Sequence, residues 1–503
     1  MALARAYGAI VSGVAGHLVT VEVDHSQGLP GVGIVGLPDA TVSEARHRVR
    51  TAFRNQKLTW PSGKVTVSLS PAELRKQGAG LDLAIAIGII GATGQVSQSV
   101  LESTVFIGEL GLDGGIRSVA GAVPAAIAAA QAGFTTVVLS LTNARQCQMV
   151  SGINVVSYSD LQHLLRGLAH KAEPLNIAEL EPMDTPVQPD LVDVLGQHHA
   201  RWALEVAAAG GHHLFMLGAP GVGKTMLAER LPGILPALTS EHALEVASIH
   251  SIAGTLDQGI DINRPPFEAP HHSSSMSAII GSVHGHSVRP GAVTKAHRGV
   301  LFLDEAPEFS RNALEVLRQP LESGRIVLNR SQWSGIVPAQ FQLIMAANPC
   351  PCGNALPDTP AKCVCRSIVK QHYFHKLSGP LMDRIDINML IPSVNAVKPG
   401  ERSAIVAQRV GEARERANRR FRHQAWSMNA DIPPDFLRGE YSVNSNALSL
   451  LEELHQREGG LRGAHRILRV SWTIADLNGR DRPSREDLAM AIHLRERPLG
   501  QAA

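Results

Sequence analysis

Glycines, a lysine and a threonine follow one another in the segment GAPGVGKT, residues 218–225. The spacing is G-x-x-x-x-G-K-[ST], and the segment stands between an apolar, strand-like run and a helical pattern. Such glycines let backbone N–H groups face phosphate oxygens, while the lysine reaches the β- and γ-phosphates and the threonine hydroxyl binds Mg²⁺. We therefore predict that ATP is held by the whole loop: Gly218, Ala219, Pro220, Gly221, Val222, Gly223, Lys224 and Thr225.

Two carboxylates end a second apolar run, VLFLDE, at residues 300–305. Taken alone, the two acids could equally mark the start of a helix. After a phosphate-binding loop, they predict that Asp304 binds Mg²⁺ and that Glu305 polarises a water for attack on the γ-phosphate. Asn348 ends the next apolar run, FQLIMAANP, and could orient the same water. Its plainer interpretation is a turn-forming Asn before Pro349.

Four of the five cysteines lie close together, in two C-x-C pairs: Cys350, Cys352, Cys363 and Cys365. Two pairs of thiolates that close one loop suit tetrahedral Zn²⁺, so we predict a structural zinc site at 350–365. An iron–sulfur or other metal site and unmetallated thiols are the alternatives. Histidine pairs at His271–His272 and His284–His286 also suggest metal binding, but the chain has 22 histidines, so such pairs arise easily by chance.

The surrounding chain alternates between strand and helix patterns in two regions. Residues 1–170 and 191–395 both alternate in this way, and they are separated by a proline-rich, acidic stretch at 171–190 that we interpret as a linker. Residues 396–503 have mainly helical patterns. The sequence therefore predicts an α/β class with a helical C-terminal part.

Composition limits the classes of protein that fit. The chain has 503 residues, 44% of them hydrophobic and 18% charged, which is typical of several globular domains. A net charge of +2 means that any nucleic acid would be bound by a local basic surface. We find neither a signal peptide nor a run of about 20 apolar residues, so we expect a cytoplasmic protein without membrane contact.

Longer segments carry a resemblance to a known family. They include residues 193–236 around the phosphate loop, FEAPHHSSSMSAIIG, RPGAVTKAHRGVLFLDEAPEFS and NPCPCG. These segments resemble the magnesium-chelatase-like branch of the AAA+ ATPases, and specifically the ComM/YifB family of bacterial competence proteins. The resemblance covers essentially the whole chain, and implies an AAA+ αβα core with a helical lid.

The resemblance implies further residues of the nucleotide site. AAA+ rings bind nucleotide between subunits, and a neighbour's arginine stabilises the transition state. SGPLMDRID matches the finger region, which implies this role for Arg384; surface pairing with Asp383 or Asp386 is the alternative.

LRGAHRIL matches the stretch that carries the sensor-2 arginine. The match implies this role for Arg462, with Arg466 as the second choice, although both could be solvated. The family holds adenine near the residues that match Val194, Gly196 and Gln197.

Motors of this branch insert loops into a central pore. HGHSVRPG occupies the helix-2 insert position, and ESGRIVLNRSQWSG is predicted to form a β-hairpin that resembles the presensor hairpin of MCM helicases. Candidate contacts to the DNA backbone are Arg330 first, then Arg325, Lys295 and Arg289; ordinary solubilising charge is the alternative. We interpret the basic stretch 401–422 as a solvated helix face.

KQGAGLDLAIAIG and the segment around GGIRSVAG resemble the proteolytic domain of Lon, with its α+β fold of the S5-domain-2 type. Lon uses a Ser–Lys dyad. Here Gly78–Ala79–Gly80 stand at the serine position, and Arg117 or its neighbours at the lysine position. Arginine is a poor base, so the resemblance implies the fold without the protease.

The leading hypothesis is a homo-oligomeric, hexameric ring ATPase that acts on single-stranded or branched DNA. The family implies branch migration during recombination, which extends strand exchange when donor DNA integrates in natural transformation. The alternatives are a metal-chelatase-type motor and a protein-remodelling ATPase. ATP, Mg²⁺ and structural Zn²⁺ are the expected cofactors, and DNA-stimulated hydrolysis separates the first hypothesis from the others.

Overall fold

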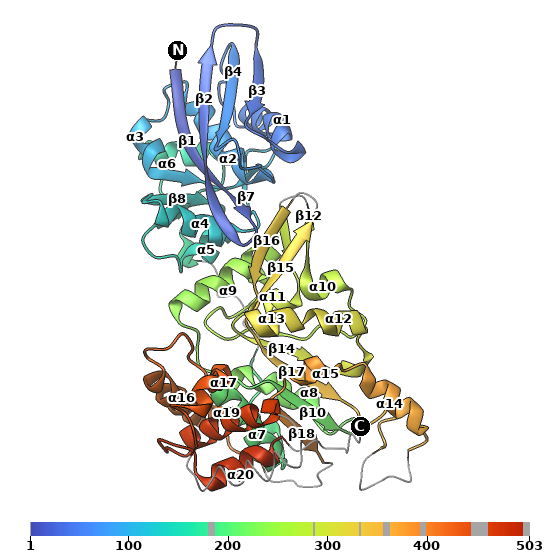
Figure 1. Ribbon diagram of the computed structural model, residues 1–503. Coiled ribbons are helices and arrows are strands. Elements are labelled where there is room, and N and C mark those ends of the chain that lie inside the picture. Colours follow the sequence, from blue (N-terminus) through green and yellow to red (C-terminus); the bar gives the residue numbers. More distant parts are fainter. Residues whose placement is uncertain are drawn as a thin grey trace.

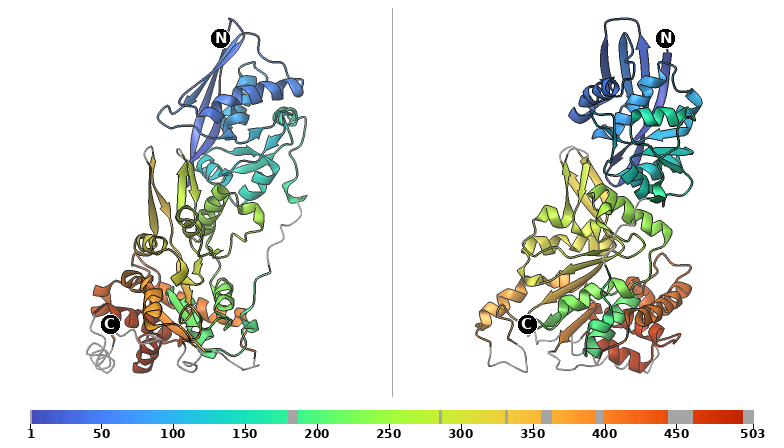
Figure 2. Two further views of the ribbon diagram at one scale, coloured as in Figure 1. Left: turned by 90° about the vertical axis from the view of Figure 1, so that its right-hand side faces the viewer. Right: turned by 180° about the vertical axis from the view of Figure 1, so that it is seen from behind.

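The computed structural model describes residues 2–179, 187–284, 287–330, 333–355, 363–392, 399–443 and 461–495. Its elements form a mixed α/β protein in three parts that follow one another along an elongated molecule (Figure 1). The two views of Figure 2 show the N-terminal sheet at one end and the C-terminal helices at the other. The predicted α/β class is therefore confirmed. Within the described residues, no helix is both long and apolar enough to cross a membrane.

The N-terminal part is built on a mixed sheet of seven strands in the order β3-β4-β2-β1-β5-β8-β9. Strands β1 and β2 form a long antiparallel hairpin, whereas β5, β8 and β9 pair in parallel. Alternate residues of β2, such as Val19, Val21 and Val23, are buried, as expected for a sheet with distinct faces. The strands are β1 Ala2–Ser12, β2 Ala15–Ser26, β3 Gly31–Val35, β4 Lys64–Ser70, β5 Thr104–Phe106, β8 Thr136–Leu139 and β9 Asn154–Ser157, with a small ribbon of β6 Glu109–Leu110 and β7 Ile116–Arg117.

Helices cover both faces of this sheet and bury two apolar clusters. Helix α2 is apolar around its whole circumference and fully buried, because it lies between the sheet and α1. The helices of this part are α1 Ala40–Asn55, α2 Asp82–Gly91, α3 Gln98–Ser103, α4 Ala122–Gln131, α5 Leu141–Cys147 and α6 Leu161–Leu168.

The central part contains a parallel five-stranded sheet in the order β11-β14-β17-β10-β18. Along β10, Leu214 and Met216 pack into one apolar cluster, whereas Phe215 and Leu217 pack into the other, because successive side chains point to opposite faces. Both faces are covered by helices, which gives the predicted αβα core. The strands are β10 Leu214–Gly218, β11 Phe267–Glu268, β14 Val300–Leu303, β17 Gln342–Ala347 and β18 Ile387–Ile391; the helices are α7 His198–Gly210, α8 Lys224–Arg230, α9 Ser240–Ala253, α10 Met276–Ile280, α11 Ala292–Lys295, α12 Arg311–Val316, α13 Arg318–Ser323, α14 Ser367–His375 and α15 Gly379–Met382.

Two β-hairpins extend from the central part toward the N-terminal sheet (Figure 1). The first consists of β12 Gly281–His284 and β13 Ser287–Pro290, and the second of β15 Arg325–Arg330 and β16 Trp333–Pro338. In the second hairpin Arg325 lies opposite Pro338 and Arg330 opposite Trp333, which confirms the predicted hairpin at this position.

The C-terminal helices are α16 Ser403–Arg420, α17 Pro434–Arg438, α19 Leu461–Leu477 and α20 Arg485–His493. They share one apolar cluster with α7 and one face of the central sheet. The prediction of a solvated basic face for 401–422 is wrong for several arginines of α16. Arg409 pairs with Glu205 (2.6 Å), Arg414 donates to the carbonyl of Ala208 (2.9 Å), and Arg420 forms an ion pair with the buried Asp476. These arginines attach α16 to α7 and α19.

Candidate functional site

The phosphate loop connects strand β10, which lies between β17 and β18, to helix α8. Gly221 and Gly223 have φ of 79° and 89°, in the left-handed region that glycine adopts readily. A Cβ built on Gly221 would meet no atom within 4 Å, so the space beside the loop is open on that side. The loop therefore fits a bound phosphate by its backbone conformation. Gln197 supports it from outside, because its side-chain amide donates to the carbonyl of Val222 (2.5 Å).

Lys224 connects the phosphate loop to the neighbouring strand. Its Nζ donates to the carbonyls of Gly218 and Ala219 (2.8 Å each) and to Oδ1 of Asn348 (3.0 Å). Burial lowers the pKa of Lys224, and the negative charges of Asp304 and Glu305 oppose that effect. Asn348 thus lies at the site, as predicted from its place after a buried strand.

The two proposed Mg²⁺ ligands lie in contact. Thr225 donates its hydroxyl proton to Oδ2 of Asp304, at 2.7 Å. A hydroxyl from the first turn of α8 and a carboxylate just after β14 provide the oxygen ligands that Mg²⁺ prefers. The residues present therefore fit the ion that the sequence predicted.

Sequence reasoning missed one partner of Glu305. The residue has φ of 50°, and Nδ1 of His272 lies 3.4 Å from its Oε2. His272 follows β11, which leads toward the same sheet edge as β14, and its ring packs on that of His271 (4.1 Å between centroids). Among the described residues, the two histidines and Glu305 do not form a group of three mutually close ligand atoms, so metal binding by the histidine pair gains no support. This contact depends on the order of the strands in the sheet, and the sequence did not predict that order.

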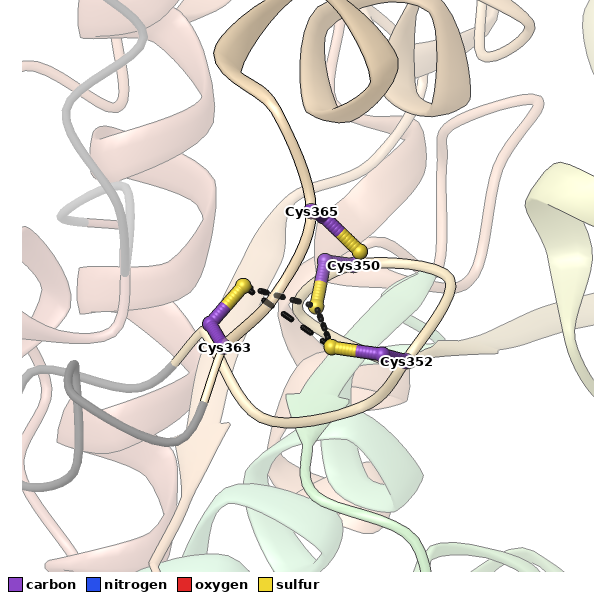
Figure 3. A group of neighbouring side chains, drawn as sticks. All are labelled: Cys350, Cys352, Cys363 and Cys365. Atoms are coloured by element: carbon purple, nitrogen blue, oxygen red, sulfur yellow. Dashed lines mark hydrogen bonds between the residues drawn. The ribbon is translucent and has the colours of Figure 1, made fainter.

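The four clustered cysteines converge on one point (Figure 3). Their sulfurs all lie within 4.8 Å of one another, and those of Cys350, Cys352 and Cys363 are 3.3–3.8 Å apart. Sulfurs bound at about 2.3 Å around a tetrahedral zinc would be separated by about 3.8 Å. The donor set and its spacing therefore fit a zinc ion.

The environments of these thiols differ. The backbone N–H of Asn354, together with Cys350, lowers the pKa of Cys352 to about 6, whereas burial raises the pKa of Cys350 to about 11. The first C-x-C turn also contacts the phosphate loop. A Cβ on Gly353 would lie 2.5 Å from Cδ of Pro220, so only glycine permits this approach. The cysteine cluster thus supports the nucleotide site from its outer side.

Arg384 does not lie at the phosphate loop of its own chain. It pairs with Glu322, and it lines a cavity of about 1520 Å³ to which none of residues 218–225 contributes. Of the two carboxylates considered from sequence, Asp386 accepts from His212 (2.9 Å), and Asp383 faces Arg466 (3.7 Å).

Arg466 lines the same cavity. Its side chain is buried, burial lowers its pKa to about 10, and its Nη1 has no hydrogen-bond partner among the residues that the structure describes. A buried guanidinium nitrogen without a partner is costly, which favours an anionic ligand from outside the described chain. The side chain of Arg462 lies outside the described residues.

The four candidates for DNA contact differ in their surroundings. Arg289 and Arg325 are exposed on the two hairpins, on β13 and β15. Lys295 is mostly buried and pairs with Glu268 (2.8 Å), which removes the reason for choosing it. The side chain of Arg330 lies outside the described residues.

The fold and the site define a P-loop ATPase of the AAA+ class. A phosphate loop, a strand ending in Asp-Glu and an Asn at the next strand meet at one edge of a parallel sheet. Models of the magnesium chelatase subunit ChlI match residues 21–143 and 190–398, and a model of its C-terminal part matches residues 400–495.

Three relatives align over nearly their full length. The chain is 45% identical to an uncharacterized protein of Mycobacterium tuberculosis, over 99% of both chains. It is 39% identical to competence protein ComM of Haemophilus influenzae, over 98% of both chains. It is 38% identical to YifB of Escherichia coli, over 98% of this chain and 97% of that protein. The chain belongs to the ComM/YifB family of magnesium-chelatase-like AAA+ proteins. A shorter likeness, 29% over 172 residues, is to Lon protease 2 of Bacillus subtilis.

Proposed function

We propose that this protein is an ATP-driven ring motor that migrates DNA branches in the cytoplasm. The observation that carries the proposal is the pair of neighbouring hairpins, each with an exposed arginine, attached to the same sheet as the ATPase site. Phosphate contacts from such residues give affinity without sequence preference, as a translocating motor requires. The name of the competence protein among the relatives suggests a role in integrating donor DNA during natural transformation.

The chemistry assigns a role to each residue of the site. Lys224 and the loop backbone bind the phosphates, and Thr225 and Asp304 would hold Mg²⁺, which would supply positive charge against the developing negative charge. Glu305 accepts a proton from the attacking water, and Asn348 orients that water. His272 is in place to hold the Glu305 carboxylate.

We infer a ring arrangement from the positions of Arg384 and Arg466. Both line a cavity apart from their own phosphate loop, so we assign them to the nucleotide of a neighbouring subunit in a homo-oligomer, expected to be a hexamer. Arg466 replaces Arg462 as the preferred sensor arginine, because its free Nη1 needs an anion. We propose four regions along the chain: a Lon-like domain at 1–170, a linker at 171–190, the AAA+ core at 191–395 and the helical lid at 396–503.

Two other functions have less support. A protease of the Lon type would need a serine at Gly78–Ala79–Gly80, and the nearby Lys76 is buried with its Nζ donating to the carbonyl of Pro71. A chelatase or protein-remodelling motor would share the ATPase site but not require basic hairpins.

The deciding experiment is ATP hydrolysis by the full-length protein alone and with linear, forked or four-way DNA. We expect branched DNA to stimulate hydrolysis. Arg289→Ala together with Arg325→Ala should reduce DNA affinity for all sequences and lower the salt dependence of binding, because each lost phosphate contact removes about 0.9 from the slope on duplex DNA. Arg311→Ala, on a helix outside both hairpins, is the matched control. Hydrolysis that responds to none of these DNAs would contradict the DNA function.

The cysteine cluster makes a separate prediction. We expect the purified protein to contain about one zinc per chain, measured by elemental analysis, and Cys363→Ser to lose it. Because Gly353 contacts Pro220, loss of the metal should also weaken ATP binding, measured by titration with a fluorescent ATP analogue. Cys147→Ser is the control, since this buried thiol lies outside the cluster. A metal-free wild-type protein that binds ATP normally would argue for unmetallated thiols.

A further inference from the structure

A valine lies at the turn of the N-terminal hairpin. Gly13 and Val14 join β1 to β2 between the paired residues Ser12 and Ala15. Gly13 has φ of 65°, the positive value that a two-residue hairpin turn needs at its first position. Turn positions favour Gly, Asn, Asp and Ser, yet Val14 is half-buried. A valine here indicates a packing partner outside its own hairpin.

That partner is formed by both hairpins of the ATPase core. Val14 packs against a small apolar cluster in which Val283 and Val288 come from β12–β13 and Val337 comes from β16. Val283 and Val288 lie directly opposite one another, and all three valines of the hairpins are buried. Arg289, a candidate DNA contact, follows Val288 directly. One residue of the N-terminal part therefore packs against an apolar cluster to which both proposed DNA-binding hairpins contribute.

The N-terminal part is also fastened to helix α9. The N–H of Gly121 donates to the carbonyl of Ser251 (3.0 Å), and the N–H of Val123 donates to its hydroxyl (3.3 Å). Ala247 and Leu256 are buried in the same apolar cluster as α4. An apolar interface restrains the relative motion of two domains, so these contacts favour a fixed position of Val14 against the hairpin cluster.

Helix α9 also forms hydrogen bonds with the segment just before β14, and that segment bonds to the one just before β17. Glu245 accepts from Arg298 (2.7 Å) and lies 3.1 Å from Nε2 of His297, and the N–H of Arg298 donates to the carbonyl of Gln340 (2.6 Å). Arg298 and Gln340 lie just before β14 and β17, and Glu305 and Asn348 follow the ends of these two strands. Helix α9 thus connects the N-terminal part, which carries Val14, to the sheet that carries the ATPase residues.

We propose that the N-terminal domain sets the position of both hairpins through Val14, and that DNA stimulation of hydrolysis depends on this contact. The functional consequence rests on the DNA function proposed above, whereas the effect on the hairpins themselves does not. Val14 is a positioning residue, because the contact through which we expect it to act is with the apolar cluster of the hairpins.

The test compares Val14→Asp with the wild type in the full-length protein. Because burial of one valine side chain corresponds to about a tenfold effect, we expect DNA-stimulated hydrolysis to fall about tenfold, with DNA-independent hydrolysis unchanged. Hydrogen exchange should become faster in residues 281–284, 287–290 and 335–338 but stay slow in β14 and β17. Val14→Ile should behave as the wild type, and so should Leu29→Asp, at a 91% exposed position of the same domain.

Different results would contradict the DNA function and the positioning role of Val14. If DNA does not stimulate the wild type, the DNA function fails, and hydrogen exchange alone decides whether Val14 positions the hairpins. If DNA stimulates Val14→Asp as strongly as the wild type, with unchanged exchange in both hairpins, the positioning role is wrong. Should Val14→Asp fold poorly, Val14→Ser provides the same comparison with a smaller perturbation.

Discussion

Replacing Glu305 by glutamine should abolish ATP turnover while leaving ATP binding intact. Glutamine keeps the size of the side chain but cannot accept a proton, and loss of a general base costs about 10²–10⁴-fold in rate. Thr225 and Asp304 bond to each other, and Lys224 bonds to Gly218 and Asn348, so these contacts do not depend on the Glu305 side chain. Turnover is measured by phosphate release, and binding by titration with a fluorescent ATP analogue.

Glu308→Gln is the matched control for this variant. Glu308 lies on the same turn, is partly exposed and pairs at 3.7 Å with Lys376, so the same substitution there should change turnover little. If Glu305→Gln hydrolysed ATP at the wild-type rate, another group would have to activate the water. If it lost ATP binding as well, Glu305 would instead shape the nucleotide site.

Replacing Arg384 by alanine should reduce hydrolysis by about 10³–10⁵-fold, because an arginine that stabilises the charge of phosphoryl transfer is worth that much. The expected loss cannot come from stability alone. Arg384 pairs with Glu322 at the surface, where both side chains are nearly half exposed, and such pairs contribute about 1 kcal/mol or less. Glu322→Ala removes the same ion pair and should leave hydrolysis nearly unchanged.

Mixing variants tests whether Arg384 acts on a neighbouring subunit. Arg384→Ala keeps an intact phosphate loop, and Lys224→Ala keeps an intact Arg384, so each supplies what the other lacks. Mixed rings of the two inactive proteins should regain hydrolysis at the interfaces where intact parts meet. Two inactive variants that stay inactive when mixed would place Arg384 at its own subunit's site or outside the chemistry.

Local motifs predicted much of the ATPase site. The phosphate loop, the Asp-Glu pair, Asn348 and the cysteine pairs were all found from spacing and from the apolar runs before them. This was possible because each motif is a short continuous segment whose backbone determines its chemistry. The parallel strands then bring these segments to one edge of the sheet, as sequence patterns predicted. The class of fold and the family were correct for the same reason.

Other features depended on contacts between distant segments. The sequence alone did not reveal that His272 faces Glu305, that Glu322 pairs with Arg384, or that arginines of α16 bind α7. A charged side chain looks the same in sequence whether it is solvated or paired, because its partner is chosen by helix packing and strand order.

The sequence by itself determined which residues can bind nucleotide and metal, since those abilities belong to short segments with particular side chains and backbone freedom. The tertiary structure decided which of them meet and which face away. It placed Arg384 and Arg466 on one cavity apart from their own phosphate loop, and it packed Val14 against an apolar cluster of two hairpins more than 260 residues away in the chain. The physical reason is that burial and charge pairing act between neighbours in space, and those neighbours exist only once the sheets and helices have packed.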